Sequence, residues 1–417
     1  MKNMLNVFVN QIKAGELWLD DLRRFCFKYD KTWLDSPESH RLSVSLPLKE
    51  DPFLNDTSYS YFTNLLPEGD ILNVISRKLQ IPVSNQFELL KAIGGDCAGA
   101  VSLYEDGKLP PKPSEYSYRT LTEERLAQVI HDLPENPFMT DEVGVRLSLA
   151  GAQEKLPVFI KDNKILVSLN GAPSSHILKT PIKGLSGTVE NETFCMLLAG
   201  KMGLDVPEVR IIKVDDICLY AITRYDRKIE NDQMVRLIQE DFCQALNVNA
   251  QMKYSPTLEE CFTLIRKESA KQITDIRRLL HLIIFNGLIG NSDAHAKNIS
   301  FIHGRGGTAI APFYDLLSTY MYPYAKKMAM KIGGGRHFQF LEPSHFEKFA
   351  KATGIKYKVV EKTILDMAGR IVGAAKETTE QFCDLYGKSP IIEEINEVIK
   401  ISSKQKLTVF SSSLTTH

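Results

Sequence analysis

An almost wholly apolar segment that ends in a dense polar packet is the feature that most constrains this chain. Leu279 to Ile289 carry apolar side chains on nearly every side of a helix, a pattern typical of a helix buried in a core. Gly290 supplies a helix stop, and the next eight residues are NSDAHAKN. Polar side chains at the end of a buried helix are well placed to be held rigidly at a cleft. We therefore expect the chemistry of this chain to lie at residues 291–298.

The composition of the 417-residue chain is ordinary, with 43% hydrophobic and 24% charged residues. At about 100–200 residues per domain, this length predicts two or three folded parts. Lys plus Arg and Asp plus Glu each number 51, so no global field draws the chain to nucleic acid or to an anionic membrane. The longest apolar run is far short of the ~20 residues that a membrane span needs. The seven scattered cysteines fit buried thiols in a reducing compartment. The N-terminus lacks the layout of a signal peptide, and we expect a cytoplasmic protein without membrane contact.

The patterning changes twice along the chain. Strand-like runs and helices alternate in the first hundred residues, and LSVSLPL at 42–48 predicts a strand by its period of two. A proline-rich link at 108–117 predicts a boundary near residue 115. Strand-like runs then surround one amphipathic helix at 189–204. Beyond Asp226 the pattern favours helices, and the polar tail is expected to fray. The helical segments expected there are 237–248, 257–269, 273–290, 344–353 and 358–377.

Asp293 and Asn298 stand five residues apart, the spacing of Asp and Asn in the kinase catalytic loop. In that loop the Asp accepts the proton of the acceptor hydroxyl and the Asn oxygen holds Mg²⁺. The segment NISFIHGRGGTAIAPFYD then predicts a strand, a Gly-rich turn and a second strand, which deliver Asp315 as a second metal ligand. The alternative is a satisfied polar turn, with Asp315 as the N-cap of a helix at LLSTYMY. His295 is expected to frame the loop, since no second His stands at metal-ligand spacing.

A phosphotransferase must also bind a nucleoside triphosphate, and two features of the sequence suit that task. Small residues in RLSLAGAQEKLPVFI, between two strand-like runs, predict a turn that can present backbone N–H groups to phosphate, although a simple β-turn is the default. Lys179 on a short strand and Glu192 on the following helix have the layout of the Lys–Glu pair that positions phosphates. An exposed Lys and a solvated Glu are the alternative. The backbone at Thr223 and Tyr225, at the end of the last strand, is a candidate for the adenine contact or an ordinary strand end.

The sequence resembles the HipA-type serine/threonine kinase toxins of bacterial toxin–antitoxin modules. The matching stretches run in family order from residue 42 to 315: LSVSLPL, TNLLPEGD, IGGDCAGAVSL, SLAGAQEKLP, HILK, VENE, RYDR, QEDFCQ, NSDAHAKN and PFYD. The resemblance implies an α+β, bilobal, protein-kinase-like fold with a β-containing N-terminal lobe and a mainly helical C-terminal lobe. We expect an N-terminal α/β subdomain at 1–115, a kinase N-lobe at 116–226, and a helical C-lobe with the catalytic and metal-binding loops at 227–417.

The resemblance also implies the site residues. It puts the general base on Asp293, Mg²⁺ on Asn298 and Asp315, and a positioning role on Glu192. It makes Ser148 the autophosphorylated residue of the Gly-rich loop, where added negative charge would repel the nucleotide phosphates and silence the kinase. The first hinge residue, often acidic in the family, is Thr223 here. The implied ATP contacts are Ala150, Gly151, Ala152, Gln153, Glu154, Lys155, Lys179, Thr223, Arg224, Tyr225, His295, Ala296, Lys297, Asn298, Tyr314 and Asp315.

The function that the resemblance implies is that of a Mg-ATP-dependent kinase toxin. Its expected substrate is an aminoacyl-tRNA synthetase, glutamyl-tRNA synthetase in the best-known branch, whose phosphorylation halts translation. Its expected partner is a HipB-like helix-turn-helix antitoxin, through which it meets operator DNA. The basic run KKMAMK at 326–331 is interpreted as a solvated loop rather than a DNA-binding patch. Two alternatives stay open: a catalytically weak corepressor that bridges antitoxins on DNA, and a kinase for a small-molecule or lipid acceptor.

Overall fold

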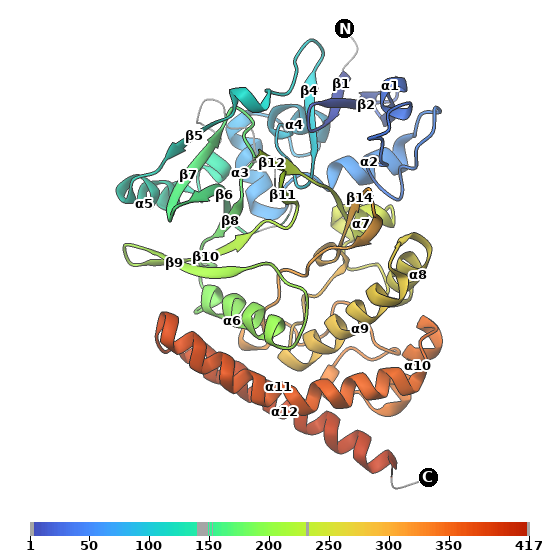
Figure 1. The fold of residues 1–417 in the computed structure, drawn as a ribbon, viewed down its shortest axis with the longest axis vertical. Coiled ribbons are helices and arrows are strands. Elements are labelled where there is room, and N and C mark those ends of the chain that lie inside the picture. The colour runs from blue at the N-terminus through green and yellow to red at the C-terminus, as the bar shows by residue number, and fades with distance from the viewer. Residues whose placement is uncertain (1–3, 140–148, 150, 152, 231–232, 415–417) are drawn as a thin grey trace. The chain divides into compact units, whose positions relative to one another are not determined.

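The computed structural model describes residues 4–139, 149, 151, 153–230 and 233–414. The predicted site residues Ser148, Ala150 and Ala152 lie outside the described residues. The chain divides into two units (Figure 1). Unit 1 comprises Met1–Thr180, Lys213–Met252 and Ser300–Thr308, and unit 2 comprises Pro181–Ile212, Lys253–Ile299 and Ala309–His417. The expected division at residues 115 and 226 stays a prediction.

The strands of the described residues form four sheets, with the orders β3-β2-β1-β4, β5-β7-β6-β8-β10-β9, β11-β12 and β13-β14-β15. Their bounds are β1 Met4–Val9, β2 Ile12–Leu19, β3 Phe25–Tyr29, β4 Val101–Glu105, β5 Ser117–Thr120, β6 Lys155–Lys161, β7 Lys164–Leu169, β8 His176–Lys179, β9 Val209–Val214, β10 Ile217–Thr223, β11 Arg227–Glu230, β12 Gln233–Arg236, β13 Ile238–Asp241, β14 Ser300–Gly304 and β15 Gly307–Ile310. The helices are α1 Lys31–Leu34, α2 Asn55–Thr63, α3 Gly69–Leu79, α4 Gln86–Ile93, α5 Glu123–Asp132, α6 Thr188–Lys201, α7 Phe242–Ala245, α8 Leu258–Glu268, α9 Gln272–Ile289, α10 Pro343–Thr353, α11 Tyr357–Tyr386 and α12 Pro390–Leu414. None of these helices combines the length and apolar character that a bilayer crossing requires.

The strand expected at 42–48 is wrong, because this stretch of unit 1 forms a tight turn closed between Ser43 and Leu46. The turn is held by the buried carboxylate of Glu240, which accepts hydrogen bonds from the Ser43 hydroxyl and, at 2.8 Å, from the Val44 N–H. Leu42 and Leu46 are fully buried. The alternating sequence pattern of 42–48 therefore belongs to a turn whose partner lies about two hundred residues away.

The helix expected at 237–248 is also wrong in its first half. Ile238–Asp241 form β13, which pairs antiparallel with β14, and the short helix α7 follows at Phe242–Ala245. A capping box starts α7: the Asp241 side chain accepts from the Gln244 N–H, and the Gln244 side chain accepts from the Asp241 N–H. The strand forms because its backbone groups find partners in β14, about sixty residues further along.

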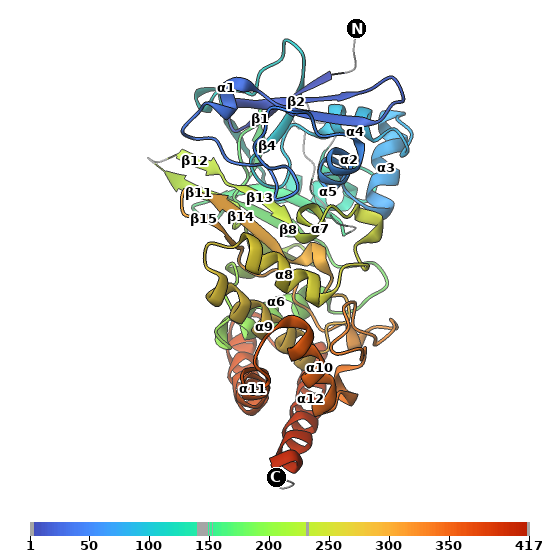
Figure 2. The same cartoon turned by 90° about the vertical axis from the view of Figure 1, so that its right-hand side faces the viewer.

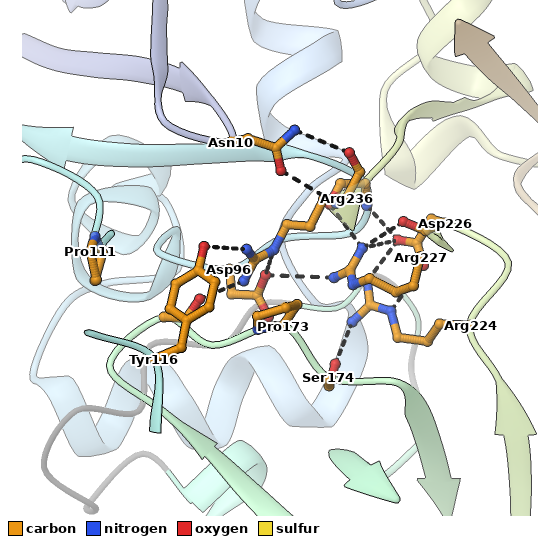
Figure 3. A network of polar contacts seen from close by, with 12 residues as sticks. Asn10, Asp96, Pro111, Tyr116, Pro173, Ser174, Arg224, Asp226, Arg227 and Arg236 are labelled. Atoms are coloured by element: carbon orange, nitrogen blue, oxygen red, sulfur yellow. Dashed lines mark hydrogen bonds and ion pairs between the residues drawn. The ribbon is translucent and has the colours of Figure 1, made fainter. Parts of the chain in front are cut away.

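A network of buried, oppositely charged side chains lies in the interior of unit 1 (Figure 3). Arg224 donates two hydrogen bonds to Asp226 at 2.9 and 2.7 Å, and Arg227 donates a third at 2.9 Å. Arg236 donates to Asp96 at 2.7 Å. Burial, together with the nearby Arg224 cation, lowers the pKa of Arg227 to about 9. Burial alone would raise the pKa of Asp226, but Arg224 and Arg227 outweigh it and hold that pKa below its usual range.

Helix α9 is the central helix of unit 2, since it packs against α8, α11 and α12. The long helices α11 and α12 lie side by side and are joined by a short connection (Figures 1 and 2). The tail expected to fray is instead helical as far as Leu414, and Phe410 near its end is fully buried against Phe346. Within the described part of the tail, Lys404 and Thr408 are exposed, whereas Lys406 and Phe410 are buried in the unit.

Lys406 on α12 is a buried lysine of unit 2. Its ammonium group donates to the Leu341 carbonyl and, at 3.4 Å, to the Gln339 carbonyl. It also lies 5.1 Å from the centre of the Phe338 ring and 5.6 Å from that of Phe346. Burial lowers its pKa to about 8 from an ordinary value of 10.5, because the charged form loses its water.

Replacing Asp226 with Asn should lower the free energy of unfolding by about 3 kcal/mol or more, because the Arg224 and Arg227 charges lose their buried counterion. The measurement is urea unfolding at pH 7, with the exposed Asp216→Asn as the matched control. The lowered pKa of Asp226 means that its contribution is present above the ordinary value of 3.8 and is lost as pH falls through the folded-state pKa. The gap between wild type and Asp226→Asn should therefore narrow below about pH 4. Equal stability of the two proteins at pH 7 would contradict the role of this network.

Lys406 also makes the unfolding free energy rise with pH, but in the alkaline range instead of the acidic one. Between pH 8 and 10.5 the unfolded chain holds a proton at this position that the folded chain has lost, so the unfolding free energy rises with pH. The rise should approach about 1.4 kcal/mol per pH unit. Lys406→Met should lack this rise, whereas Lys404→Met, an exposed neighbour on α12, should keep it. Unfolding curves from pH 7 to 9.5 measure the difference, and parallel pH profiles for wild type and Lys406→Met would exclude a depressed pKa.

Candidate active site

The polar packet begins where α9 ends inside unit 2. Gly290 ends the helix in the left-handed conformation, with a φ of 73°, and a side chain there would come within 2.8 Å of the Tyr320 ring. The Asn291 N–H donates to the Asn286 carbonyl at 2.8 Å, and the two side chains are joined at 3.0 Å. These bonds satisfy carbonyl groups that a helix end leaves open, and they fix the direction in which the loop departs.

Two other segments of unit 2 hold the loop from its sides. The Ser292 N–H donates to the Thr319 hydroxyl at 2.7 Å, and the Thr319 N–H donates to the Gly290 carbonyl at 3.0 Å. On the other side, the Ala329 N–H donates to the Ser292 carbonyl at 2.9 Å. The residue before Asp293 is therefore fixed by the chain that follows Asp315 and by the chain around Ala329.

Asp293, His295 and Asn298 lie in one hydrogen-bonded turn. The His295 N–H donates to the Asp293 carbonyl at 2.8 Å, and the Asn298 N–H donates to the His295 carbonyl at 3.0 Å. The side-chain amide of Asn298 donates to the Asp293 carbonyl at 3.3 Å, which orients the amide through its nitrogen. Its oxygen is thus the atom left to bind a cation. Ala296, Lys297 and Asn298 form a 3-10 turn, and the Tyr314 hydroxyl donates to the Lys297 carbonyl at 2.8 Å.

Asp315 follows the predicted hairpin of β14 and β15, and it is not a helix N-cap. Residues 311–318 contain no helix, and Asp315 has a left-handed φ of 60°, a conformation that Asp tolerates better than most residues. The end of β15 is tied down within unit 2: the Ile310 N–H donates to the buried Asp275 carboxylate at 2.9 Å, and Arg278 donates to the Ile310 carbonyl at 2.7 Å. The Asp275 and Arg278 side chains therefore fix the chain five residues before Asp315, and Asp315 itself lies outside any helix.

One pocket of unit 2 brings these polar residues together. It encloses about 530 Å³ of space, including the open solvent at its mouth. His295, Asn298, Tyr314 and Asp315 line it, together with an apolar wall that consists chiefly of Leu258, Leu282, Ile283, Met328, Met330 and Ile332. The Asp293 carboxylate, from the same loop, accepts a hydrogen bond at 2.7 Å from the hydroxyl of Tyr254. The pocket thus combines amide and carboxylate oxygens with an apolar wall that can exclude water.

Tyr254 and the segment around Met328 are functional candidates that sequence reasoning missed. Tyr254 precedes Asp293 by thirty-nine residues, and its ring also meets that of His295 edge-on at 5.2 Å. Met328 and Met330 follow Asp315 within the basic run that the sequence predicted to be a solvated loop. Their lysine neighbours are exposed while the methionines are buried. The apolar triplet at 328–330 between lysines was a weak sequence signal for the methionines, and no local signal marks Tyr254.

The residues predicted to bind phosphate in unit 1 lie on adjacent strands. Lys155 on β6 and Lys179 on β8 are directly opposite each other in the antiparallel register. A side chain at Gly151 would come within 2.7 Å of the Lys155 ammonium group, so this cation lies against the glycine of the predicted loop. The Lys179 ammonium group lies 5.3 Å from the centre of the Tyr220 ring. Lys155 beside a glycine with a left-handed φ of 107°, with Lys179 opposite it on the next strand, suits an anionic ligand.

The other residues of unit 1 that were predicted to contact ATP have side chains that bind other residues of the same unit. The Gln153 amide donates to the Thr180 carbonyl at 3.0 Å, and the Thr180 hydroxyl donates to Glu154 at 3.2 Å. The Thr223 hydroxyl lies 3.3 Å from His176 Nε2, and the Tyr225 hydroxyl donates to Gln239 at 3.0 Å. The Arg224 side chain belongs to the buried ion network. A nucleotide contact at residues 223–225 would accordingly come from the backbone.

Glu192 lies on α6 of unit 2 and is buried, with 3% of its surface exposed. Its neighbour Asn191 fixes the helix to the chain after Asp315: the Asn191 amide donates to the Ser318 carbonyl at 2.8 Å, and its oxygen accepts from the Ser318 N–H at 2.8 Å. A buried Glu excludes the solvated alternative. Lys179 belongs to unit 1, and its pairing with Glu192 stays a prediction.

The donor set fits a magnesium ion of the kind that kinases use. Among the described residues no cluster of three or more His, Cys, Asp or Glu side chains could hold a metal alone. Mg²⁺ in phosphotransferases is bound by one or two protein oxygens together with substrate phosphates. Asn298 and Asp315 supply an amide and a carboxylate oxygen to one pocket, as that mode requires.

Comparisons with known proteins agree with this architecture. A family model for the HipA N-terminal domain matches residues 5–104, and a model for the HipA-like C-terminal domain matches residues 147–375. The chain is 36% identical to Y4mE of Sinorhizobium fredii, over 98% of this chain and 99% of that protein. It is 29% identical to the serine/threonine-protein kinase toxin HipA of Shewanella oneidensis, over 89% of this chain and 88% of that protein.

A solved structure of HipA from Shewanella oneidensis MR-1, in complex with HipB and operator DNA, superposes with a TM-score of 0.82 at 26% identity. It covers 98% of this chain and 97% of that chain. The expected α+β, HipA-like fold is therefore confirmed, and the chain belongs to the HipA family of toxin kinases.

Proposed function

We propose that this chain is a Mg-ATP-dependent serine/threonine protein kinase that acts as a toxin. The observation that carries the proposal is the pocket of unit 2, which Asn298 and Asp315 line and beside which the same loop presents the Asp293 carboxylate. These are the base and metal-binding groups of a phosphotransferase, in the order that its catalytic loop and hairpin require. The family to which the chain belongs supports a hydroxyl of a protein as the acceptor, in preference to a lipid or small molecule.

Each group has a distinct task in this mechanism. Bound Mg-ATP supplies an electrophilic γ-phosphoryl group and neutralises its negative charge. Asp293 accepts the proton of the acceptor hydroxyl, which makes the oxygen a better nucleophile. The oxygens of Asn298 and Asp315 would hold the divalent cation. We also propose that Lys155 and Lys179 of unit 1 bind phosphate. The apolar wall around Met328 and Met330 excludes water from the pocket.

The finer parts of the proposal concern regulation and target. We propose that Ser148 is the residue whose autophosphorylation silences the kinase, by adding negative charge to the loop of Gly151 and Lys155. We further propose an aminoacyl-tRNA synthetase as the substrate, glutamyl-tRNA synthetase first. Phosphorylation of such an enzyme would stop translation and growth.

A helix-turn-helix antitoxin similar to HipB is the partner that we propose. The support is the likeness to a HipA that was solved with HipB and operator DNA, over nearly the whole of both chains. The same likeness favours a second candidate function, that of a corepressor with weak catalysis. The two candidates differ in phosphoryl transfer, which the corepressor does not need.

Asp293→Asn should lower phosphoryl transfer by about 10²–10⁴-fold, because the amide cannot accept the hydroxyl proton. The measurement is mass spectrometry of the full chain incubated with Mg-ATP and a panel of aminoacyl-tRNA synthetases. Wild type should carry phosphate at Ser148 and on one synthetase, and Asp293→Asn on neither.

The exposed Asp384→Asn of the same unit is the matched control and should behave as wild type. Transfer at the wild-type rate by Asp293→Asn would reject this residue as the base. No transfer by wild type to itself or to any synthetase would favour the corepressor.

Asn298→Ala should raise the Mg²⁺ concentration needed for half-maximal transfer, because the cation loses one of its two protein oxygens. A rise on the order of tenfold is expected, in line with the loss of one hard ligand. Titration of autophosphorylation with MgCl₂ at saturating ATP measures it. Asn396→Ala, on α12, is the control. An unchanged Mg²⁺ dependence would remove Asn298 from the metal site.

A further inference from the structure

We propose that the Tyr254 hydroxyl occupies the position on Asp293 that the acceptor hydroxyl takes during phosphoryl transfer, so that Tyr254 gates the acceptor site. The inference rests on the proposed function, because it takes Asp293 as the general base. It goes further because it places the acceptor hydroxyl where the Tyr254 hydroxyl now contacts Asp293. The substrate must then displace Tyr254.

The distance between the two groups carries the inference. The Tyr254 hydroxyl donates to Asp293 Oδ1 at 2.7 Å. A general base must stand about 2.6–3.2 Å from the hydroxyl whose proton it accepts. The phenol oxygen therefore stands where the oxygen of an acceptor serine or threonine would stand. A protein hydroxyl and the phenol cannot share that position.

The surroundings of Tyr254 hold its ring in this place. The ring meets His295, a lining residue of the pocket, at 5.2 Å and an interplanar angle of 78°. The Lys253 ammonium group lies 5.5 Å from the centre of the ring, within the range of a cation–π contact. The turn that carries Tyr254 runs into α8, whose start is fixed by a capping box between Thr257 and Glu260. Tyr254 is thus presented by a well-defined turn.

The exposure of Tyr254 makes its displacement feasible. The side chain is 51% exposed, whereas the lining residues His295 and Met328 are 5% and 8% exposed. A ring that is half in water can turn outward without opening a cavity in the core. Water can also take over the hydrogen bond that the phenol gives up. Tyr254 therefore covers the base in the resting protein and can leave it when a substrate binds.

Covering the base has a chemical consequence. In the productive step the acceptor oxygen forms a bond to the γ-phosphorus, the bond from that phosphorus to the β,γ-bridging oxygen breaks, and ADP leaves with the electron pair. The acceptor proton passes to the Asp293 carboxylate. Water that reached Asp293 would undergo the same step and would consume ATP without a substrate. The phenol prevents this by occupying the position until a protein hydroxyl displaces it.

The first test uses water as the acceptor. Tyr254→Phe keeps the ring and removes the hydroxyl, so Mg-ATP hydrolysis without any protein substrate should rise on the order of tenfold, the equivalent of one hydrogen bond to a charged group. Tyr324→Phe is the matched control, because Tyr324 is 56% exposed in the same unit, and its hydrolysis rate should equal that of wild type. A fall in hydrolysis would make Tyr254 a positioning residue for Asp293 and overturn the gate. An unchanged rate, or phosphate found on Tyr254 itself, would also overturn it.

The second test needs no nucleotide. Acetylation of tyrosine hydroxyls by N-acetylimidazole, followed by mass spectrometry, should modify Tyr254 faster in Asp293→Ala than in wild type, while Tyr324 reacts equally in both. Equal reactivity of Tyr254 would overturn the contact on which the gate depends. The two tests separate the two proposals: if neither wild type nor Tyr254→Phe exceeds the hydrolysis of Asp293→Asn, the proposed kinase function fails, whatever the acetylation of Tyr254.

Discussion

The end of helix α9 inside the core of unit 2 is the constraint on which the site depends. A buried helix end leaves carbonyl groups that must find donors. Asn291 and Thr319 provide these donors, at Asn286 and Gly290, and a third donor, Ala329, binds Ser292. The same bonds that satisfy the helix end therefore bring the chain after Asp315 and the chain around Ala329 against the loop of Asp293. The geometry of the site therefore follows from the way in which the carbonyl groups at this buried helix end are satisfied.

The sequence predicted those parts of the fold whose pattern repeats within the element. Helices α8 and α9 fall close to their expected bounds, and strands β6 to β10 and the β14–β15 hairpin form where strand-like runs were expected. The periodicity and the turn residues suffice to predict these elements. Prediction from the sequence failed at 42–48, at 237–248 and in the tail, where a distant partner decides: the Glu240 carboxylate, strand β14, and the buried ring of Phe346. A local pattern contains no information about such partners.

The candidate site divides in the same way. The spacing of Asp293 and Asn298 predicted the Asp and Asn of a kinase catalytic loop, and the two residues lie in one hydrogen-bonded turn. The hairpin after them brings Asp315 to the pocket that Asn298 lines, and the backbone there excludes the helix N-cap alternative. The base and metal-binding roles stay predictions. Tyr254 was invisible to sequence reasoning, because its contact with Asp293 joins residues thirty-nine positions apart. Only the packing of the turn before α8 against the loop reveals it.

The stretches that carry the family resemblance meet one another in pairs. LSVSLPL touches QEDFCQ where Val44 donates to Glu240, and IGGDCAGAVSL touches RYDR where Gly99 donates to Asp226. NSDAHAKN touches PFYD through the Tyr314 hydroxyl, and the strand that begins at the end of SLAGAQEKLP pairs with HILK. The first two contacts are buried and structural, whereas the last two build candidate binding sites. A family motif can therefore serve the fold instead of the chemistry. The arginines of RYDR are an example, because they belong to the buried ion network of unit 1.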